Sequence, residues 1–296
     1  MSAKTVAIIG AGRVGGAVGR LLAQAGYSVT AVATRNRESA ERARAFIGAG
    51  VAMTDLVRAA ASADIVLITT PDGAITSVCD SIAAGKGFRP GAVVAHMSGA
   101  RSLDLLEAAK SSGAFRVVIH PLQSVPTMEL GVRNISGSYF RIEADPEVAE
   151  RARELVHALG GIELKMSKWV SDKGSAALYH AGAVAVSNFF VALVDFGLRY
   201  YQALGADKEE ALKAVLPLIR GTLANIESAG IPDALTGPIM RGDVETVKGH
   251  LEAMASRSPE LLPLYRELAR HTVIVAQDKN SITPQTAADI QKLMEQ

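Results

Sequence analysis

Short apolar runs alternate with helix-like segments along the first part of the chain. The runs that predict strands are Thr5–Ile9, Ser28–Ala33, Asp64–Thr69, Ala92–Ala95 and Arg116–Ile119. Between them the apolar residues take helical spacing, and Ser102 is expected to cap one of these helices, Leu103–Lys110. Alternation of apolar strands with helices predicts a parallel, doubly wound α/β sheet.

A different pattern begins after about Ser167, where the strand signals stop. Just before it, Ser138–Glu143, a helix that begins at Pro146, and Gly161–Lys165 predict one further β-α-β addition to the sheet. Beyond it, the signals are helical. The residues that mark the helix starts are Asp172, Asp207, Asp243, Pro259 and Thr283-Pro284. We therefore expect an α/β domain over residues 1–166 and an all-helical domain over residues 167–296.

One of these helices, expected from about Asp172 to Leu204, is unusually apolar. The segment from Gly174 to Val194 contains no Lys, Arg, Asp or Glu and is long enough to cross a membrane. It does contain polar residues, among them His180 and Asn188. This composition favours a helix buried in a soluble protein or in a dimer over a membrane span.

Three glycines occupy the turn after the first predicted strand, in a Gly-x-Gly-x-x-Gly pattern that opens a helix. In such a unit the first glycine makes the turn, the second lets the backbone approach a pyrophosphate, and the third lets helix and strand pack closely. The helix N-terminus adds unpaired N–H groups and a positive dipole end. The residues predicted to line a dinucleotide here are Gly10, Ala11, Gly12, Arg13, Val14 and Gly15.

The end of the second predicted strand indicates which dinucleotide the site binds. An NAD site usually carries Asp or Glu there, on the ribose 2′-hydroxyl. This chain has Thr34, Arg35, Asn36 and Arg37 instead. An acid would repel a 2′-phosphate, whereas two guanidinium groups can grip it. We therefore expect NADP(H), although the same arginines would also suit the solvated start of the next helix.

Ligands of an open parallel sheet lie beyond the carboxyl ends of its strands. The segments in that position are Thr69–Asp72, His96–Gly99 and His120–Ser124. Thr70, Pro71 and Ser98 are expected to line the cofactor, and His120 and Gln123 the nicotinamide side. Each histidine would equally serve as a structural hydrogen-bonding group at a strand end, and Ser98 as part of a simple turn.

The apolar helix supplies further polar groups. Lys173, His180 and Ser187 are spaced by seven residues, and Asn188 is eight from His180, so that they lie along one side of the helix. A ligand in an interdomain cleft would give them partners, as would an internal network or a second subunit, because an unpaired buried group costs about 1–3 kcal/mol. Arg241 could clamp a substrate carboxylate or pair with an acid of the protein.

The composition restricts the kinds of partner and metal that the protein is expected to bind. Lys plus Arg number 31 and Asp plus Glu 30 among 296 residues, so a nucleic acid or an anionic membrane held by bulk charge is not expected. The single cysteine, Cys79, excludes an intrachain disulfide and fits a reducing cytoplasm. The scattered histidines lack tight ligand spacing, so no metal is expected.

Several stretches together resemble one family. They are Gly10–Gly15, His96–Ala100, His120–Ser124, Tyr179–Ala183 with Ser187-Asn188, and Leu235–Ile239 with Arg241–Asp243. The chain looks like the Rossmann-like oxidoreductases that carry domain of unknown function 2520 after the nucleotide domain, within the 6-phosphogluconate dehydrogenase-like superfamily. The resemblance implies an NADP(H)-binding sheet, a helical domain that commonly dimerises, and a substrate cleft between them.

One departure from the wider superfamily affects the proton donor. Its hydroxyacid and ketopantoate members use a lysine on the long helix with an asparagine one turn later. Here Lys173 is followed one turn later by Ala177, and His180 with Asn188 is the nearest substitute. The identity of the substrate depends on this difference.

These observations predict an NADPH-dependent reductase of a small, carboxylated carbonyl or imine compound, with a ketopantoate-like 2-keto acid as the most natural substrate. His180 is the first choice as proton donor, Asn188 and Ser98 would hold the reacting oxygen, and Arg241 the carboxylate. Lys173 and His120 complete the predicted catalytic set. Two alternatives stay open: a non-catalytic NADP(H)-binding sensor or dimer, and hydride transfer between NADP and a deazaflavin. We expect a cytoplasmic homodimer formed through the helical domain.

Overall fold

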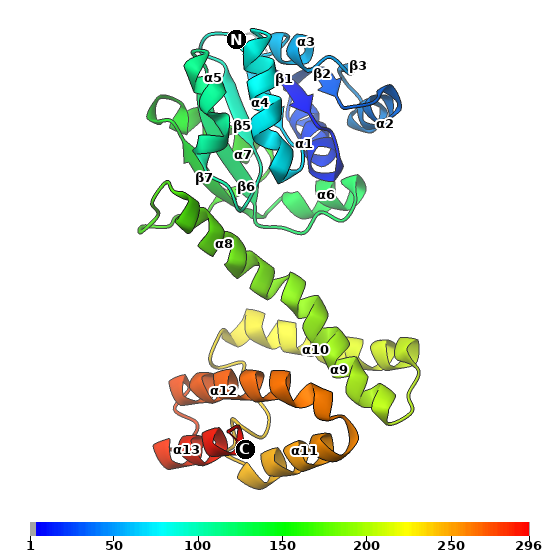
Figure 1. The fold of residues 1–296 in the computed structure, drawn as a ribbon, viewed down its shortest axis with the longest axis vertical. Coiled ribbons are helices and arrows are strands. Elements are labelled where there is room, and N and C mark those ends of the chain that lie inside the picture. The colour runs from blue at the N-terminus through cyan, green and yellow to red at the C-terminus, as the bar shows by residue number, and fades with distance from the viewer. Residues whose placement is uncertain (1–3, 296) are drawn as a thin grey trace. The chain divides into compact units, whose positions relative to one another are not determined.

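The computed structural model describes residues 4–295, which fall into two compact units, Met1–Ser187 and Asn188–Gln296 (Figure 1). The first unit contains a sheet flanked by helices, and the described part of the second is helical. The expected order, an α/β sheet followed by an all-helical region, is confirmed. The boundary at residue 166 stays a prediction.

Within residues 4–295, eight strands form one sheet in the order β3-β2-β1-β4-β5-β6-β7-β8. They are β1 (Thr5–Ile9), β2 (Ser28–Ala33), β3 (Val51–Met53), β4 (Ile65–Ile68), β5 (Val93–His96), β6 (Phe115–Pro121), β7 (Tyr139–Ala144) and β8 (Ile162–Glu163). The first six strands pair in parallel. Their order reverses at β1 and β4, which is where sheets of this kind bind ligands, beyond the carboxyl ends of the strands.

An apolar core lies on each face of the sheet. Val6 and Ile8 of β1 belong to one core, and Ala7 and Ile9 to the other, because side chains alternate along a strand. The helices that pack on the first face are α1 (Arg13–Gln24), α2 (Arg37–Ile47), α6 (Met128–Ile135) and α7 (Ala149–Ala158). Those on the second face are α3 (Leu56–Ala61), α4 (Ile75–Ala84) and α5 (Glu107–Ser111). Burial from both sides explains the nearly continuous apolar strands.

The last two strands extend the sheet with a change of direction. β7 runs antiparallel to β6, and β8 runs parallel to β7, with α7 between them in sequence. In the β6–β7 register, Arg141 lies directly opposite His120. Opposed residues of an antiparallel pair project from the same face. The antiparallel strand therefore brings a guanidinium beside the end of β6.

The structure corrects some local expectations. Ser102 does not cap a helix over Leu103–Lys110, because that segment forms a 3-10 turn, η2 (Leu103–Leu106), before α5, and the Ser102 hydroxyl donates to Asp104. Strand β3 and helix α3 were not expected, since runs this short show little periodicity. The apolar helix is divided into α8 (Lys173–Val186) and α9 (Asn188–Ala203).

The second unit has its own helical core. After α9 its helices are α10 (Lys208–Ala229), α11 (Val244–Arg257), α12 (Leu262–Asp278) and α13 (Pro284–Leu293), with Pro259 opening a short 3-10 turn ahead of α12. The side chains of Asp207, Asp243 and Thr283 cap their helices, which begin where the sequence predicts. Buried residues from α11, α12 and α13, among them Val247 and Val273, form the core.

The stretch Lys173–Ala203 is long and apolar enough to cross a membrane, judged by length and composition alone, with a mean hydropathy of 1.7. Among the described residues, Ala176 is the buried residue of α8 and Leu198 that of α9. The expected burial inside the chain's own core is therefore not observed for this stretch. Burial in a dimer stays a prediction.

Candidate functional site

The glycine turn between β1 and α1 has the geometry that its pattern predicts. Gly10 has a φ of +84°, in the left-handed region that favours glycine. A Cβ on Gly10 would lie 2.5 Å from Thr70 Cγ2, and one on Gly15 would lie 2.2 Å from Thr69 Oγ1. These two glycines therefore let the turn and α1 pack against the end of β4.

Gly12 is in a different situation. A Cβ there would have Gly10 O, at 3.9 Å, as its nearest neighbour, so no protein atom requires a glycine at this position. The N-terminus of α1 begins at Arg13, directly after it. An open space at a helix N-terminus suits an anionic group held by backbone N–H groups. The turn fits a pyrophosphate on structural grounds.

The end of β2 carries the residues expected at a ribose phosphate. The Asn36 side chain caps α2 by accepting from Ser39 N, and Thr34 Oγ1 donates to Asn36 O at 2.7 Å. Arg35 and Arg37 are both exposed, and Arg37 pairs with Glu41 on the same helix, at 2.7 Å. An exposed pair of this kind is weak and can be exchanged for another anion.

His96 organises the loop after β5. It is fully buried, its Nδ1 accepts from Ser98 N at 3.2 Å, and its Nε2 lies 3.0 Å from Ser102 O. Because Nδ1 accepts, Nε2 carries the proton and donates to the carbonyl. Burial lowers the pKa of His96 to about 4. His96 is thus a neutral structural group, the alternative role left open for it.

The hydroxyl and the carbonyl of Ser98 also hold it in place. Its Oγ donates to Asp72 Oδ2 at 2.7 Å, in the turn after β4, and its carbonyl accepts from Arg141 Nη2 at 3.2 Å. The segments after β4 and β5 are joined through this serine. That connection supports the predicted position of Ser98 at the carboxyl edge of the sheet.

His120 and His180 lie against the same glycine. A Cβ on Gly99 would lie 2.7 Å from His120 Nε2 and 2.9 Å from His180 Nδ1. The two imidazole centroids are 6.4 Å apart. Two of the predicted site residues, one at the end of β6 and one on α8, are therefore brought together above the loop after β5.

Tyr179 completes this cluster. Its hydroxyl lies 3.0 Å from His120 Nδ1, and burial raises the pKa of Tyr179 to about 12. Burial, together with the nearby charge of Arg141, lowers the pKa of His120 to about 3. Both partners are therefore neutral near pH 7. Tyr179 belongs to one of the stretches that resemble the family, but the sequence predicted no role for it.

Arg141 was missed by the sequence prediction. Its guanidinium is fully buried, and Nη2 donates to the carbonyls of Ser98 and Arg101. The guanidinium carbon lies 4.9 Å from the ring centroid of Trp169 and 5.5 Å from that of Tyr179. The available signal was the charge alternation of Arg141 and Glu143 in an otherwise apolar strand, which is usually a sign of a solvated face.

The remaining predicted residues lie apart from this cluster or in the second unit. Lys173 is exposed and pairs with Asp104 at 3.5 Å. Asn188 begins α9, and Arg241 precedes α11, both in the second unit. His250, also in the second unit, contacts the Tyr265 hydroxyl at 2.9 Å. Among residues 4–295 there is no group of three His, Cys, Asp or Glu side chains arranged to hold a metal.

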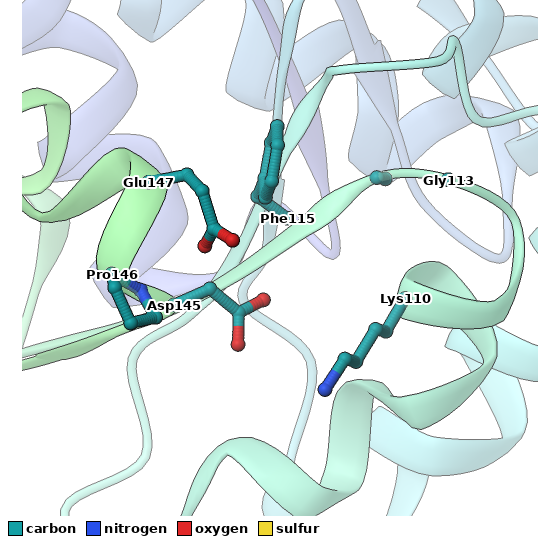
Figure 2. Close-up of a pocket in the computed structure, with 7 residues that line it drawn as sticks. Lys110, Gly113, Phe115, Asp145, Pro146 and Glu147 are labelled. Carbon is teal, nitrogen blue, oxygen red and sulfur yellow. The ribbon is translucent and has the colours of Figure 1, made fainter.

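Figure 2 shows a pocket near the start of β6, at the other end of that strand from His120. Lys110, Phe115, Asp145 and Glu147 are among its lining residues. Phe115 begins β6, whereas His120 lies near the end of that strand. Arg116 already engages Asp145, at 2.8 Å. The pocket is therefore separate from the cluster around Gly99.

The sequence matches two family models. Residues 2–121 match a Rossmann-like domain, and residues 138–272 match a domain of unknown function, DUF2520. No curated protein matches the sequence. The chain therefore carries a Rossmann-like domain followed by a DUF2520 domain, as its motifs predicted.

Solved structures share this fold. A candidate NADP oxidoreductase from Bacteroides fragilis is 22% identical, with a TM-score of 0.71 over 92% of this chain and 98% of the other. A protein from Thermotoga maritima is 24% identical, with a TM-score of 0.70 over 92% and 99%. A pyrroline carboxylate reductase from Plasmodium falciparum, with NADP bound, is 15% identical, with a TM-score of 0.54 over 99% and 98%. At these identities the likeness is one of fold.

We expect His96 to make the fold sensitive to mild acid. The folded protein resists a proton that the unfolded chain accepts, because the pKa of His96 falls from 6.5 to about 4 on burial. The stability due to neutral His96 is complete above pH 6.5 and is lost as the pH falls toward 4. The loss should be on the order of 2 kcal/mol by about pH 5, measured by urea unfolding. His96→Gln should make this part of the profile less steep and leave the contribution of His120, and an unchanged slope would contradict the assignment.

Proposed function

We propose that this chain is an NADPH-dependent reductase of a small, carboxylated carbonyl or imine compound. The observation that carries the proposal is the shared edge of one sheet. There, a glycine turn suited to a pyrophosphate follows β1, and His120, near the end of β6, meets Tyr179 and His180 of α8. This edge is where sheets of this order bind a dinucleotide and the compound it reacts with.

The glycine turn would hold the pyrophosphate of NADP(H), with Gly12 against it and the N-terminus of α1 facing it. Arg35 and Arg37 would take the 2′-phosphate, since no acid stands at the end of β2. The names of the solved structures that share the fold, which include an NADP oxidoreductase and an NADP-bound reductase, support this choice. When bound, NADPH supplies the hydride.

The protein must then supply a proton to the developing alkoxide or amine. His120 is poorly suited to do so as a cation, because its pKa lies at about 3. His180 is the other imidazole that faces Gly99, and histidine is the side chain that most often serves as a general acid in enzymes. We assign proton donation to His180, and assign to Ser98, His120 and Tyr179 the orientation of the reacting group. Roles for Lys173, Asn188 and Arg241 stay predictions.

A substrate panel with a histidine variant tests the reductase. NADPH oxidation should be detected with at least one 2-keto acid or cyclic imine. His180→Gln should then lower kcat by about 10²–10⁴-fold, the usual contribution of a general acid, while the Kd for NADPH is unchanged. His157→Gln, an exposed change on α7, is the matched control. Tight NADPH binding without turnover of any compound would favour the sensor hypothesis instead.

Removing both guanidinium groups from the end of β2 tests the cofactor. Arg35→Ala with Arg37→Ala should weaken NADPH binding at least about tenfold and leave NADH binding nearly unchanged, because a charge-assisted contact to the 2′-phosphate is lost. Arg42→Ala removes another exposed guanidinium of α2, which pairs with Glu38, and serves as the control. Equal weakening of the two dinucleotides, measured by calorimetry, would refute the assignment.

We also propose a homodimer formed through the helical region. The second unit exposes large apolar side chains on α9 and α10, among them Phe189 at 64%, Val191 at 70% and Leu218 at 67%. Large apolar side chains exposed together on a protein surface often mark an interface. A second copy of the chain would cover it.

Sedimentation of a charge-substituted variant tests the dimer. Val191→Glu with Leu218→Glu should shift the protein from dimer to monomer, since buried carboxylates would oppose association. Lys213→Glu, an exposed change on α10 that removes no apolar surface, should leave the dimer intact. A wild-type protein that sediments as a monomer at micromolar concentration would rule the proposal out.

A further inference from the structure

The Arg141 guanidinium is buried without a full set of partners. Nη2 donates to two backbone carbonyls, but Nε and Nη1 have no hydrogen-bond partner among residues 4–295. The nearest carboxylate is that of Glu143, whose Oε2 lies 3.8 Å from Nη1. The other oxygen of Glu143, Oε1, accepts from Ser171 and Leu103 N. Burying donors of a charged group in this way is costly unless an acceptor meets them.

Two further unpartnered polar atoms belong to residues of the same cluster. Trp169 Nε1 and His180 Nδ1 are also buried without a hydrogen-bond partner among the described residues. The Trp169 and Tyr179 rings cover the guanidinium, at 4.9 and 5.5 Å from its carbon. The cluster therefore offers several N–H donors and one cation, with aromatic rings that exclude water. Such a set is complementary to a small anion with two or more oxygens.

Arg141 lies close to the residues of the proposed reaction. Arg141 Nη2 donates to Ser98 O, and the next residue, Gly99, lies against His120 and His180. Arg141 also stands directly opposite His120 in the sheet register. An anionic group at the guanidinium would thus be close to the imidazole that is proposed to donate the proton.

We propose that Arg141 forms the carboxylate subsite of this protein, and that the compound it takes is a 2-keto or 2-imino acid. The carboxylate would accept from the unpartnered guanidinium N–H groups and from Trp169 Nε1. In a 2-keto or 2-imino acid the carboxylate is bonded directly to the reacting carbon, so a carboxylate held by Arg141 would bring that carbon toward His120 and His180. The identity of the bound anion as a substrate rests on the reductase proposal, but its binding does not.

Trp169 provides a direct readout, because it is the single tryptophan of the chain. Oxalate, a stable dicarboxylate similar in shape to a 2-keto acid, is titrated into the full-length protein without NADPH. We expect a saturable change in tryptophan fluorescence. The uncharged analogue oxamide should produce none, since it carries no anion for the guanidinium.

Arginine variants locate the binding group. Arg141→Met should weaken oxalate binding at least tenfold, and Arg133→Met, an exposed arginine on α6, should not change it. If Arg141→Met does not fold, Arg141→Lys retains the charge but loses the planar fork, and should still weaken binding severalfold. Equal binding by wild type and the Arg141 variants, loss of binding in Arg241→Met alone, or no saturable response of the wild type would each overturn the proposal.

NADPH binding and oxidation are measured on the same proteins, so that the two proposals fail separately. If a 2-keto acid is reduced with the same KM by wild type and by Arg141→Lys, the subsite is wrong and the reductase stands. If oxalate binds through Arg141 but no compound oxidises NADPH, the subsite stands and the reductase is wrong.

Discussion

Parallel, in-register pairing of β1, β4, β5 and β6 is the constraint on which the candidate site depends. Backbone hydrogen bonds hold these strands side by side in one direction, so their carboxyl ends meet at one edge. Gly10, Thr70, Ser98 and His120 are far apart in the sequence, and each follows or ends one of these strands. The same pairing requires glycine at Gly10 and Gly15, because the turn and α1 approach the end of β4 too closely for a Cβ.

Burial then decides the chemistry of the side chains at that edge. Removal from water keeps His96 and His120 neutral, and it leaves the Arg141 guanidinium short of partners. Burial has different consequences for these groups. His96 holds a loop in place, whereas Arg141 retains N–H donors that can bind an anion. The antiparallel strand β7 creates this difference, since it inserts Arg141 beside His120.

Much of the fold could be predicted because its signals are local. The strands β1 and β2 and the caps Asp207, Asp243 and Thr283 match their expected positions, since each depends on a few adjacent residues. Failures occurred where tertiary contacts compete with local preference. Ser102 donates to Asp104 instead of capping a helix, and β3 is three residues long and is held by its pairing with β2.

By itself, the sequence determined the glycine turn, the absence of an acid at the end of β2, and the families to which the two parts of the chain belong. These follow from residue types at fixed spacing, and such motifs can be recognised in the sequence without knowledge of the fold. Only the tertiary structure decided that His120, Tyr179 and His180 meet, and that Arg141 joins them at full burial. The reason is physical: a charged residue alternating with apolar ones in a strand is consistent with solvent or with a buried ligand site. The burial that distinguishes them comes from Trp169 and α8, which are distant in the sequence.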